Sequence, residues 1–202
     1  MVRSADPIGL PRPKLKGEIS VAQAIKKRRS IRDFLDANLS LREVSQLLWA
    51  AQGVTAPDGA RAVPSAGALY PLETYLAVGR VRGLDAGAYR YQPRGHALTQ
   101  VTKKDLREPM AATAEQEWIA DASVILAWSA VYGRTTRAYG ERGRIYVHME
   151  VGHAVQSVSL QAVAMNLASV VVGAIDEDEV RRMLRLPKYQ VPLCLMPVGK
   201  PE

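Results

Sequence analysis

Cysteine is nearly absent from this sequence of 202 residues, which contains only Cys194. A single cysteine excludes a disulfide framework, and with it the small secreted domains that depend on one. Cys194 stands in an apolar run, residues 191–198, where an unpaired thiol most simply behaves as a small buried hydrophobe. This cysteine usage is typical of a reducing compartment, so we expect a cytoplasmic protein.

The sequence also lacks signals for export or for insertion into a membrane. Its N-terminus has no apolar segment of the kind that a signal peptide requires. Residues 151–175 carry no formal charge and are long enough to span a bilayer, but they include His153, Gln156 and Asn166. We therefore expect a helix that is buried in protein or at a subunit interface, with no membrane partner.

Several common catalytic motifs are missing. The sequence has no GxGxxG fingerprint, no Walker A loop, no GxSxG elbow and no HExxH pair. Its three histidines are His96, His148 and His153, and the last two are five residues apart, a spacing poorly suited to one helix face. These absences disfavour a separate dinucleotide-binding fold, a metal site and a serine hydrolase.

Acidic residues are scarce at the N-terminus. Residues 1–32 contain nine Lys or Arg and only two acids, Asp6 and Glu18, whereas the remaining 170 residues have 18 of each sign. The whole net charge of +7 therefore belongs to this segment, which is expected to meet an anion or to act as a solvated arm. Three prolines before residue 14 predict that residues 1–19 form an extended arm, followed by one domain over residues 20–202.

The pattern beyond the arm predicts interleaved helices and strands. Ser20 can cap a helix that ends near Lys27, and Ser40 with Glu43 forms a capping box for a second helix, which Gly53 ends. Strands are predicted at residues 73–78, 88–91, 97–101, 123–131 and 191–198, and helices at 104–120 with a break at Pro109, at 146–167 and at 177–186. An Arg-rich connector spans residues 134–144. This order favours an α+β domain with one mixed or mainly antiparallel sheet.

One segment offers donors for a phosphate group. In Arg28-Arg29-Ser30-Ile31-Arg32-Asp33-Phe34, two guanidinium groups lie four residues apart with a hydroxyl between them. A basic helix end that faces the negative end of its own dipole would have the same composition. The segment resembles the opening flavin motif of the flavin-dependent nitroreductase family.

Three further segments carry the same resemblance. Residues 64–71 are similar to the family's loop that reaches the flavin of the partner subunit, with Ala68 where many members have Asn and Leu72 where they have Trp. Residues 139–143, 150–156 and 172–174 are similar to the pattern of the azoline (thiazoline/oxazoline) dehydrogenase-like branch, and residues 197–201 to the closing strand with its basic residue. In this order the segments cover residues 21–201.

The resemblance implies a nitroreductase-like fold with a long central helix at a homodimer interface, where two FMN sites lie. It assigns the cofactor contacts to a set that the sequence contains at matching positions: Arg28, Arg29, Ser30, Arg32, Pro64, Ser65, Ala66, Gly67, Ala68, Leu69, Gly173, Ala174, Gly199 and Lys200. It also implies ping-pong hydride transfer from NADH or NADPH through FMN to a small acceptor such as a quinone or a nitroarene. In the azoline branch the flavin instead oxidises a peptide heterocycle, for which Tyr70, Lys188 and Tyr189 are candidate proton acceptors.

Two other hypotheses stay open. A nucleic-acid-binding module would use residues 3–32 to follow phosphates, but no aromatic residue for base stacking precedes Phe34, and residues 64–71 would have no role. We therefore expect no nucleic-acid partner. A family member that binds FMN without turnover is the second alternative.

Overall fold

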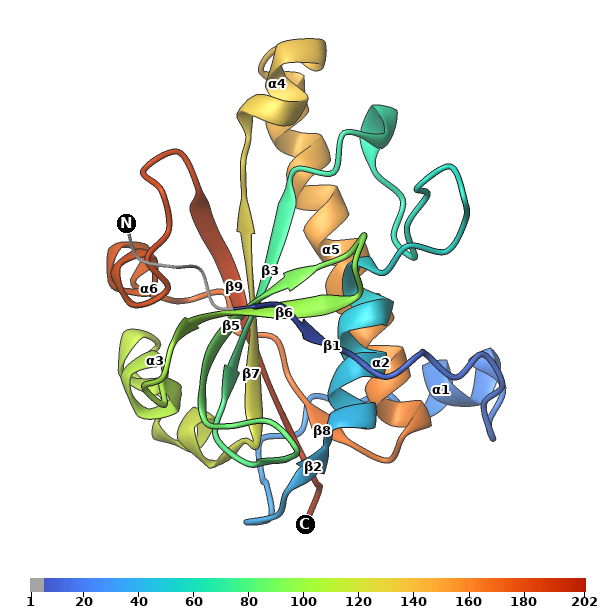
Figure 1. Ribbon diagram of the computed structural model, residues 1–202, viewed down its shortest axis with the longest axis vertical. Helices are drawn as coiled ribbons and strands as arrows, with labels where there is room; N and C mark the ends of the chain where they lie inside the picture. Colours follow the sequence, from blue (N-terminus) through green and yellow to red (C-terminus); the bar gives the residue numbers. More distant parts are fainter. Residues whose placement is uncertain (1–5) are drawn as a thin grey trace.

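The computed structural model describes residues 6–202. Its centre is a seven-stranded sheet with the order β1-β6-β5-β3-β7-β9-β8, in which each neighbouring pair is antiparallel (Figure 1). A short parallel pair, β2 with β4, lies apart from this sheet. The predicted α+β class is confirmed.

The strands of the large sheet are β1 Ile8–Gly9, β3 Leu72–Val78, β5 Gly87–Gln92, β6 Ala97–Thr102, β7 Val124–Ala130, β8 Ala168–Ser169 and β9 Val191–Gly199, and the small pair is β2 Leu39–Ser40 and β4 Val81–Arg82. The helices are α1 Val21–Lys27, α2 Leu41–Gln52, α3 Arg107–Thr113, α4 Gly133–Tyr139, α5 Arg142–Ala164 and α6 Glu177–Met183, with 3-10 turns η1 Ala66–Ala68 and η2 Glu117–Asp121.

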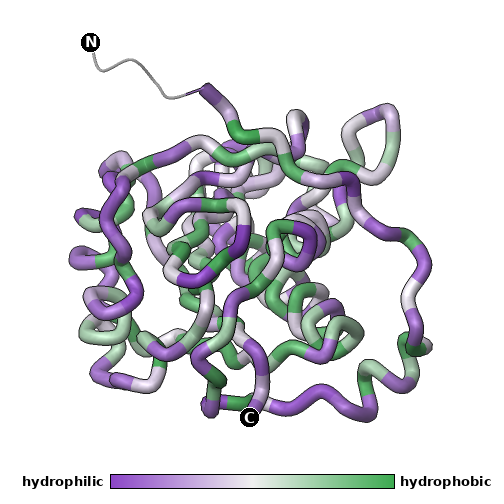
Figure 2. Tube along the Cα trace, turned by 60° about the horizontal axis from the view of Figure 1, so that its bottom comes forward, coloured by the Kyte–Doolittle hydropathy of each residue, from purple (hydrophilic) through white to green (hydrophobic). Residues whose placement is uncertain are grey.

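Helices cover both faces of the sheet, and alternate residues of one strand enter two different cores. In β3, Leu76 packs with the apolar sides of α2 and α5, whereas Tyr75 packs with α3 and α6. This alternation follows from the period of two along a strand. Figure 2 shows the result along the chain, with hydrophobic segments gathered inside and hydrophilic segments around them.

The predicted helix caps are confirmed. The Ser20 hydroxyl accepts the N–H of Gln23, and the Ser40 hydroxyl accepts the N–H of Glu43, while the Glu43 carboxylate accepts the N–H of Ser40 in return. Gly53 ends α2 as expected. The strands predicted around residues 73–78, 88–91 and 97–101 are β3, β5 and β6, and the last two form the expected hairpin.

The helix prediction over residues 104–120 is wrong in two respects. Pro109 lies inside the first turn of α3 and does not break it, because N–H groups in that turn have no helical acceptor for a proline to lose. The helix ends instead near Glu115, which has a left-handed backbone with a φ of 52°, and η2 follows as a separate turn.

The Arg-rich connector is also more ordered than predicted. Its first six residues belong to α4, and α5 begins at Arg142, four residues earlier than expected. Gly140 adopts a φ of 57° between the two helices, so it allows the chain to turn where most residues would be strained. Within residues 6–202, no helix has both the length and the apolar character that crossing a bilayer requires.

The described part of the N-terminal arm lies against the domain. β1 pairs with β6, and the carbonyl of Pro11 accepts hydrogen bonds from the Ser45 hydroxyl and the His96 ring. Gln46 accepts the N–H of Lys14 at 2.8 Å and donates to the carbonyl of the same residue at 3.1 Å. Backbone contacts thus hold residues 8–14 to α2 and to the hairpin. Arg3 of the predicted basic arm lies outside the described residues.

Candidate functional site

Strand register divides the predicted cofactor residues into two groups. β7 pairs Ala130 with Leu72 of β3 and with Val191 of β9, so the loop that precedes β3 meets the sheet where β9 begins. Lys200 follows the opposite end of β9. At about 3.3 Å per residue, the two ends are roughly 20–25 Å apart. Figure 1 shows this separation, with the loop (teal) far above the C-terminus. The upper group is residues 64–69, which form the loop before β3. Within one chain it therefore does not meet Lys200.

The lower group comprises Arg28, Arg29, Ser30, Arg32, Gly199 and Lys200, and backbone contacts between distant segments assemble it. The N–H of Ile31 donates to the carbonyl of Ser169 at 3.1 Å, and the N–H of Leu35 donates to the carbonyl of Lys200 at 3.0 Å. Phe34 forms a bridge with Pro201. These contacts bring the segment of residues 28–34 beside the end of β9.

Gly199 is required by this arrangement. A Cβ at Gly199 would lie 2.9 Å from Cδ1 of Phe34, closer than such atoms approach in proteins. Phe34 is buried against Ala122 and Ala168, and Trp118 packs on the same cluster. Glycine at this position therefore allows the aromatic ring to close over the end of the strand.

The basic side chains of the lower group are not equivalent. Within the described residues, the side chains of Arg28 and Ser30 make no hydrogen bond or ion pair, and Ser30 is exposed. Arg29 instead donates to the carbonyls of Lys26 and Arg28, at 3.0 and 2.7 Å. Arg32 lies over the ring of Trp118, 5.7 Å from its centroid. Arg28 and Ser30 are thus the donors that an incoming anion would meet.

Lys200 is already paired inside the chain. Its ammonium group lies 2.6 Å from the Glu43 carboxylate, which also caps α2. Burial alone would raise the pKa of Glu43, but the hydrogen bonds from Lys200 and Ser40 outweigh it and leave the pKa below its usual value. Lys200 would therefore share its charge between this carboxylate and any bound phosphate.

Gly173 lies along the same edge of the sheet. Val172 forms a bridge with Leu195, midway along β9, and Gly173 and Ala174 are exposed directly after it. A Cβ at Gly173 would meet nothing within 4 Å, and its N–H donates to no group of the described chain. The edge of the sheet between Gly173 and the lower group is therefore an open surface, and the Gly173 N–H is a free donor on it.

The loop of the upper group has a strained backbone. Gly67, Ala68 and Tyr70 have left-handed φ angles of 60°, 53° and 45°. For residues other than glycine this conformation costs roughly 1–2 kcal/mol each. The Ser65 hydroxyl accepts the N–H of Tyr70 at 2.9 Å, and a Cβ at Gly67 would lie 2.8 Å from the Tyr139 hydroxyl at the end of α4. The strain is thus held by contacts on both sides of the loop.

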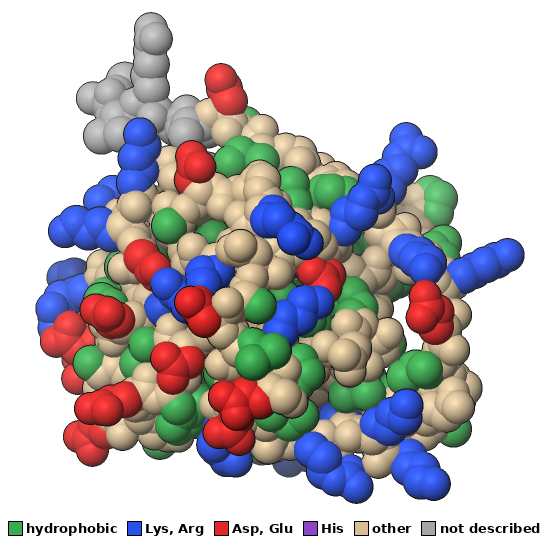
Figure 3. Space-filling view, turned by 90° about the horizontal axis from the view of Figure 1, so that it is seen from below, with side chains coloured by type: hydrophobic (Ala, Val, Ile, Leu, Met, Phe, Trp, Pro, Cys, Tyr) green, Lys and Arg blue, Asp and Glu red, His purple; other side chains and the backbone are tan. Residues whose placement is uncertain are grey.

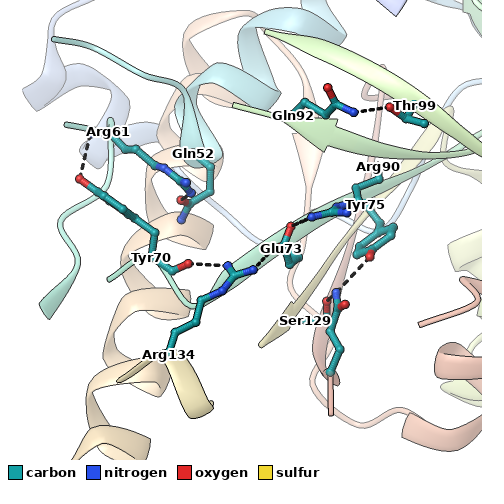
Figure 4. A network of polar contacts seen from close by, with 11 residues as sticks. Gln52, Arg61, Tyr70, Glu73, Tyr75, Arg90, Gln92, Thr99, Ser129 and Arg134 are labelled. Carbon is teal, nitrogen blue, oxygen red and sulfur yellow. Dashed lines mark hydrogen bonds and ion pairs between the residues drawn. The ribbon is translucent and has the colours of Figure 1, made fainter. Parts of the chain in front are cut away.

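Tyr70 is the anchor of this loop (Figure 4). The guanidinium of Arg61 lies 4.2 Å from the centroid of its ring, and the N–H of Arg61 donates to its hydroxyl. Arg134 of α4 donates to the Tyr70 carbonyl at 2.8 Å and to the Glu73 carboxylate at 2.5 Å. The half-exposed Arg90 donates to the other oxygen of Glu73. Sequence reasoning missed this network, because its members lie in four separate segments.

Lys188 and Tyr189 also lie at the upper end. They are in the turn between α6 and β9, where both are exposed and Tyr189 retains 69% of its accessible surface. The next residue, Gln190, is buried and donates to the hydroxyls of Tyr75 and Ser129. Gln190 therefore fixes the start of β9 and leaves the two candidate side chains facing solvent at the end of the sheet that also carries Tyr70.

Glu150, the first residue of the 150–156 segment, is a buried carboxyl whose burial the sequence did not predict. It comes from α5, is 3% exposed, and has one oxygen, Oε1, without a partner in the described residues. Burial raises its pKa to about 7, against the opposing effects of the Ser65 hydroxyl, the charge of Arg61 and the Gln52 amide. Glu150 is therefore a buried carboxyl whose protonated form is favoured by its surroundings.

A hollow of about 900 Å³ lies between the N-terminal arm, α2 and the end of α5. Its lining includes a set of cations: Arg12, Lys14, Lys16, Lys27 and Arg42. Figure 3 shows Lys and Arg side chains on the right and lower right of the view and also on its left, whereas most acids lie on the left and lower left. Ile31, Glu43 and Pro201 also line it, so the hollow borders the lower group, although Arg28, Ser30 and Gly173 are not part of its wall.

Comparison with known proteins assigns this chain and its fold to a known class. Residues 25–200 match the family described as the Nitroreductase family. A nitroreductase homologue from Methanocaldococcus jannaschii is 45% identical over 184 residues, which are 91% of this chain and 92% of the homologue. The chain therefore belongs to the nitroreductase family of oxidoreductases.

Solved structures agree with this assignment. A nitroreductase homologue from Ralstonia eutropha JMP134 superposes with a TM-score of 0.87 at 25% identity, covering 100% of this chain and 92% of that chain. A chain of the E. coli microcin synthetase complex McbBCD, solved with truncated pro-MccB17 bound, gives a TM-score of 0.76 at 24% identity, covering 96% and 77%. The predicted nitroreductase-like fold is confirmed.

Glu150 predicts a specific pH dependence of stability. Its folded pKa, about 7, is above the ordinary value of 4.5, so its favourable contribution is complete below pH 4.5 and is lost as the pH rises through 7. Glu150→Gln should remove this loss. The free energy of unfolding of the variant, relative to wild type, should therefore be on the order of 2 kcal/mol larger at pH 8 than at pH 5. Urea unfolding at the two pH values measures the change.

The matched control is Glu108→Gln, since Glu108 is exposed on α3. It should leave the pH dependence of the wild type unchanged. Parallel pH profiles of wild type and Glu150→Gln would show that Glu150 is not the buried titrating group.

Proposed function

We propose that the protein is a homodimeric, FMN-dependent oxidoreductase that accepts hydride from NADH or NADPH and passes it to a small oxidised acceptor, such as a quinone or a nitroarene. The observation that carries the proposal is the sheet edge on which the free donors of Arg28, Ser30 and the Gly173 backbone share one side. A phosphate at one end and a flat ring at the other would fit this order. Bound FMN would supply the hydride-carrying ring.

The chain's own groups have distinct roles in this proposal. The Arg28 guanidinium and the Ser30 hydroxyl bind the phosphate, and Lys200 adds positive charge while it remains paired with Glu43. The Gly173 N–H donates to the ring edge, where the absence of a side chain leaves room for close approach. Arg32, which lies over Trp118, places a further positive charge near this edge.

A second subunit would complete the site. Ile145 and Met149 lie one helical turn apart on α5 and are 42% and 50% exposed, and Gly152 follows on the same side. Large apolar side chains on the longest helix favour an interface with a second copy. The second copy would bring residues 64–69 to a sheet edge that they do not reach within their own chain. The single buried thiol, Cys194, is consistent with the cytoplasmic location that we propose.

The proposal predicts a bound flavin that is reduced by one substrate and reoxidised by another in the same cleft. The purified protein should show flavin absorbance, NADH or NADPH should bleach it anaerobically, and a quinone or nitroarene should restore it. Steady-state kinetics should give parallel double-reciprocal lines. A protein that binds no FMN when supplied with it, or whose flavin no reductant reaches, would contradict the proposed function.

A second candidate is oxidation of a peptide azoline ring by the same flavin. It is favoured by the exposed Lys188 and Tyr189 at the upper end of the sheet and by the fold shared with a chain of the microcin synthetase complex. Under this alternative, neither nicotinamide reduces the flavin, whereas a thiazoline-containing peptide does. Lys188→Ala should then abolish this reduction without changing FMN content.

Arg28 predicts a test of phosphate binding. Arg28→Ala removes a charge-assisted contact and should weaken FMN binding by one to two decades, equivalent to roughly 1.5–3 kcal/mol. Riboflavin has no phosphate, so its weaker binding should be nearly the same in the variant and the wild type. Fluorescence titration of apoprotein with each flavin measures both constants.

Lys26→Ala is the matched control, because Lys26 is exposed at the end of α1 and its removal changes the net charge by the same amount. It should alter FMN affinity by less than threefold, as expected of a screened surface charge. Equal FMN affinities for wild type and Arg28→Ala would assign the basic segment to another anion.

A further inference from the structure

We infer that the hollow between the N-terminal arm, α2 and the end of α5 is a binding site for a nucleoside diphosphate. Its volume of about 900 Å³ lies within the range of pockets that hold small ligands. The inference goes beyond the proposed function and does not depend on it, because Arg28, Ser30, Gly173 and Lys200 do not line the hollow.

The arm forms one wall of the hollow and is fastened at both ends. Gln46 of α2, which is 7% exposed, accepts the N–H of Lys14 and donates to the carbonyl of the same residue. At the other end, Ser20 caps α1. Residues 15–19 cross between these two points, and all of them line the hollow. Figure 1 shows the arm running past α2 to α1 at the right of the view, and Figure 3 shows an opening on the same side.

The cations of the hollow exceed what its acids neutralise. Five cations line it: Arg12, Lys14, Lys16, Lys27 and Arg42. The acids are Glu43, which is paired with Lys200 at 2.6 Å, and Glu18, which faces Lys14 at 4.0 Å. In the described part of the chain, the other four cations have no side-chain hydrogen bond or ion pair. Four unpaired cations around one hollow favour a ligand with two or more negative charges.

Arg42 is unfavourable for the helix that carries it. It is the second residue of α2, where the free N–H groups already give the helix end a positive partial charge. The neighbouring carboxylate, Glu43, is engaged by Ser40 and Lys200 and does not pair with Arg42. A residue that lowers stability while it lines a cationic hollow is typical of a binding residue.

The remaining wall suits a planar base. Trp49 of α2 lines the hollow together with Val163 and Met165 at the end of α5. Trp49 is only partly buried, and its indole is held over Gly53, where a Cβ would collide with the ring. An aromatic ring of this kind stacks on any nucleobase, because every base has a π face.

Two amides complete the wall. Asn166 lines the hollow, is exposed, and makes no side-chain hydrogen bond within residues 6–202. Gln161 uses its side-chain oxygen to accept from Gln46 at 3.1 Å, and its NH₂ group has no acceptor among these residues. The two amides can therefore pair with the polar edge of a base or with a ribose hydroxyl. Cations, an aromatic ring and free amides together match the phosphates, base and sugar of a nucleotide.

The test is a titration of ADP into the protein saturated with FMN, measured by calorimetry and by tryptophan fluorescence. ADP should bind about tenfold more tightly than AMP, and adenosine should bind more weakly than both, because each lost phosphate removes charge-assisted contacts. Stacking of the base should quench the fluorescence of Trp49. Trp49→Phe should lose this quenching although Trp118 and Trp128 remain, and calorimetry should still detect ADP.

Arg42→Ala separates binding from folding. It should weaken ADP binding by roughly tenfold, because it removes one charge-assisted contact. The midpoint of urea unfolding should stay the same or rise, because the variant removes a cation from the positive end of α2. The matched control is Arg94→Ala, since Arg94 is exposed in the turn between β5 and β6 and does not line the hollow. Its affinity for ADP should equal that of the wild type within about twofold.

NADH distinguishes two sources of the same chemistry, because it contains an ADP group. If NADH displaces ADP and Arg42→Ala raises the KM for NADH without lowering kcat, the hollow holds that half of the hydride donor. If NADH does not displace ADP, the ligand is a free nucleotide. Either result supports the site.

Four results would overturn the inference. They are a lack of ADP binding at about 1 mM, equal affinities of wild type and Arg42→Ala, pyrophosphate binding as tightly as ADP, and displacement of FMN by ADP. The third would mean that no base is recognised, and the last would assign the hollow to the cofactor. A protein that binds ADP but no FMN would leave this inference intact and contradict the proposed function instead.

Discussion

The antiparallel sheet keeps the two ends of each strand apart, and this separation governs how the protein can form a site. Leu72 at the start of β3 lies in register with the start of β9, whereas Lys200 follows the end of β9. The loop before β3 is thereby directed away from the open sheet edge at Gly173. If both contact one flavin, the contact has to cross between two copies. Dimerisation is then a requirement of the strand order and not only a means of burying apolar surface.

The last strand connects most parts of this arrangement. Its first residue follows Gln190, which is buried and bonded to Tyr75 and Ser129, and its end pairs with the chain around Phe34. The basic segment of residues 28–34 is thus held against the end of β9. Because Phe34 of this segment lies over Gly199, a side chain at that position would collide with its ring. Lys200, directly after Gly199, serves both the cap of α2 and the charge of the lower group.

The sequence predicted the local features well and the long-range polar contacts poorly. The caps at Ser20 and Ser40 and the hairpin depend on residues within a few positions of one another, so their pattern is visible without a structure. Pro109 misled because a proline breaks a helix only beyond its first turn. The cofactor residues came from the family resemblance. The burial of Glu150 could not be predicted, because the groups that surround it come from segments about 100 and 85 residues away, around Gln52 and Ser65.

The arrangement is tested most directly by a mixed dimer of two defective chains. One chain carries Arg28→Ala, which damages the phosphate end, and the other carries Ala68→Glu, which places a carboxylate on the exposed loop. Each homodimer should bind FMN weakly at both sites, but the mixed dimer, isolated with two different tags, should regain one site of wild-type affinity per dimer. A mixed dimer that binds FMN no better than either homodimer would show that the loop and Arg28 do not serve one flavin across two chains.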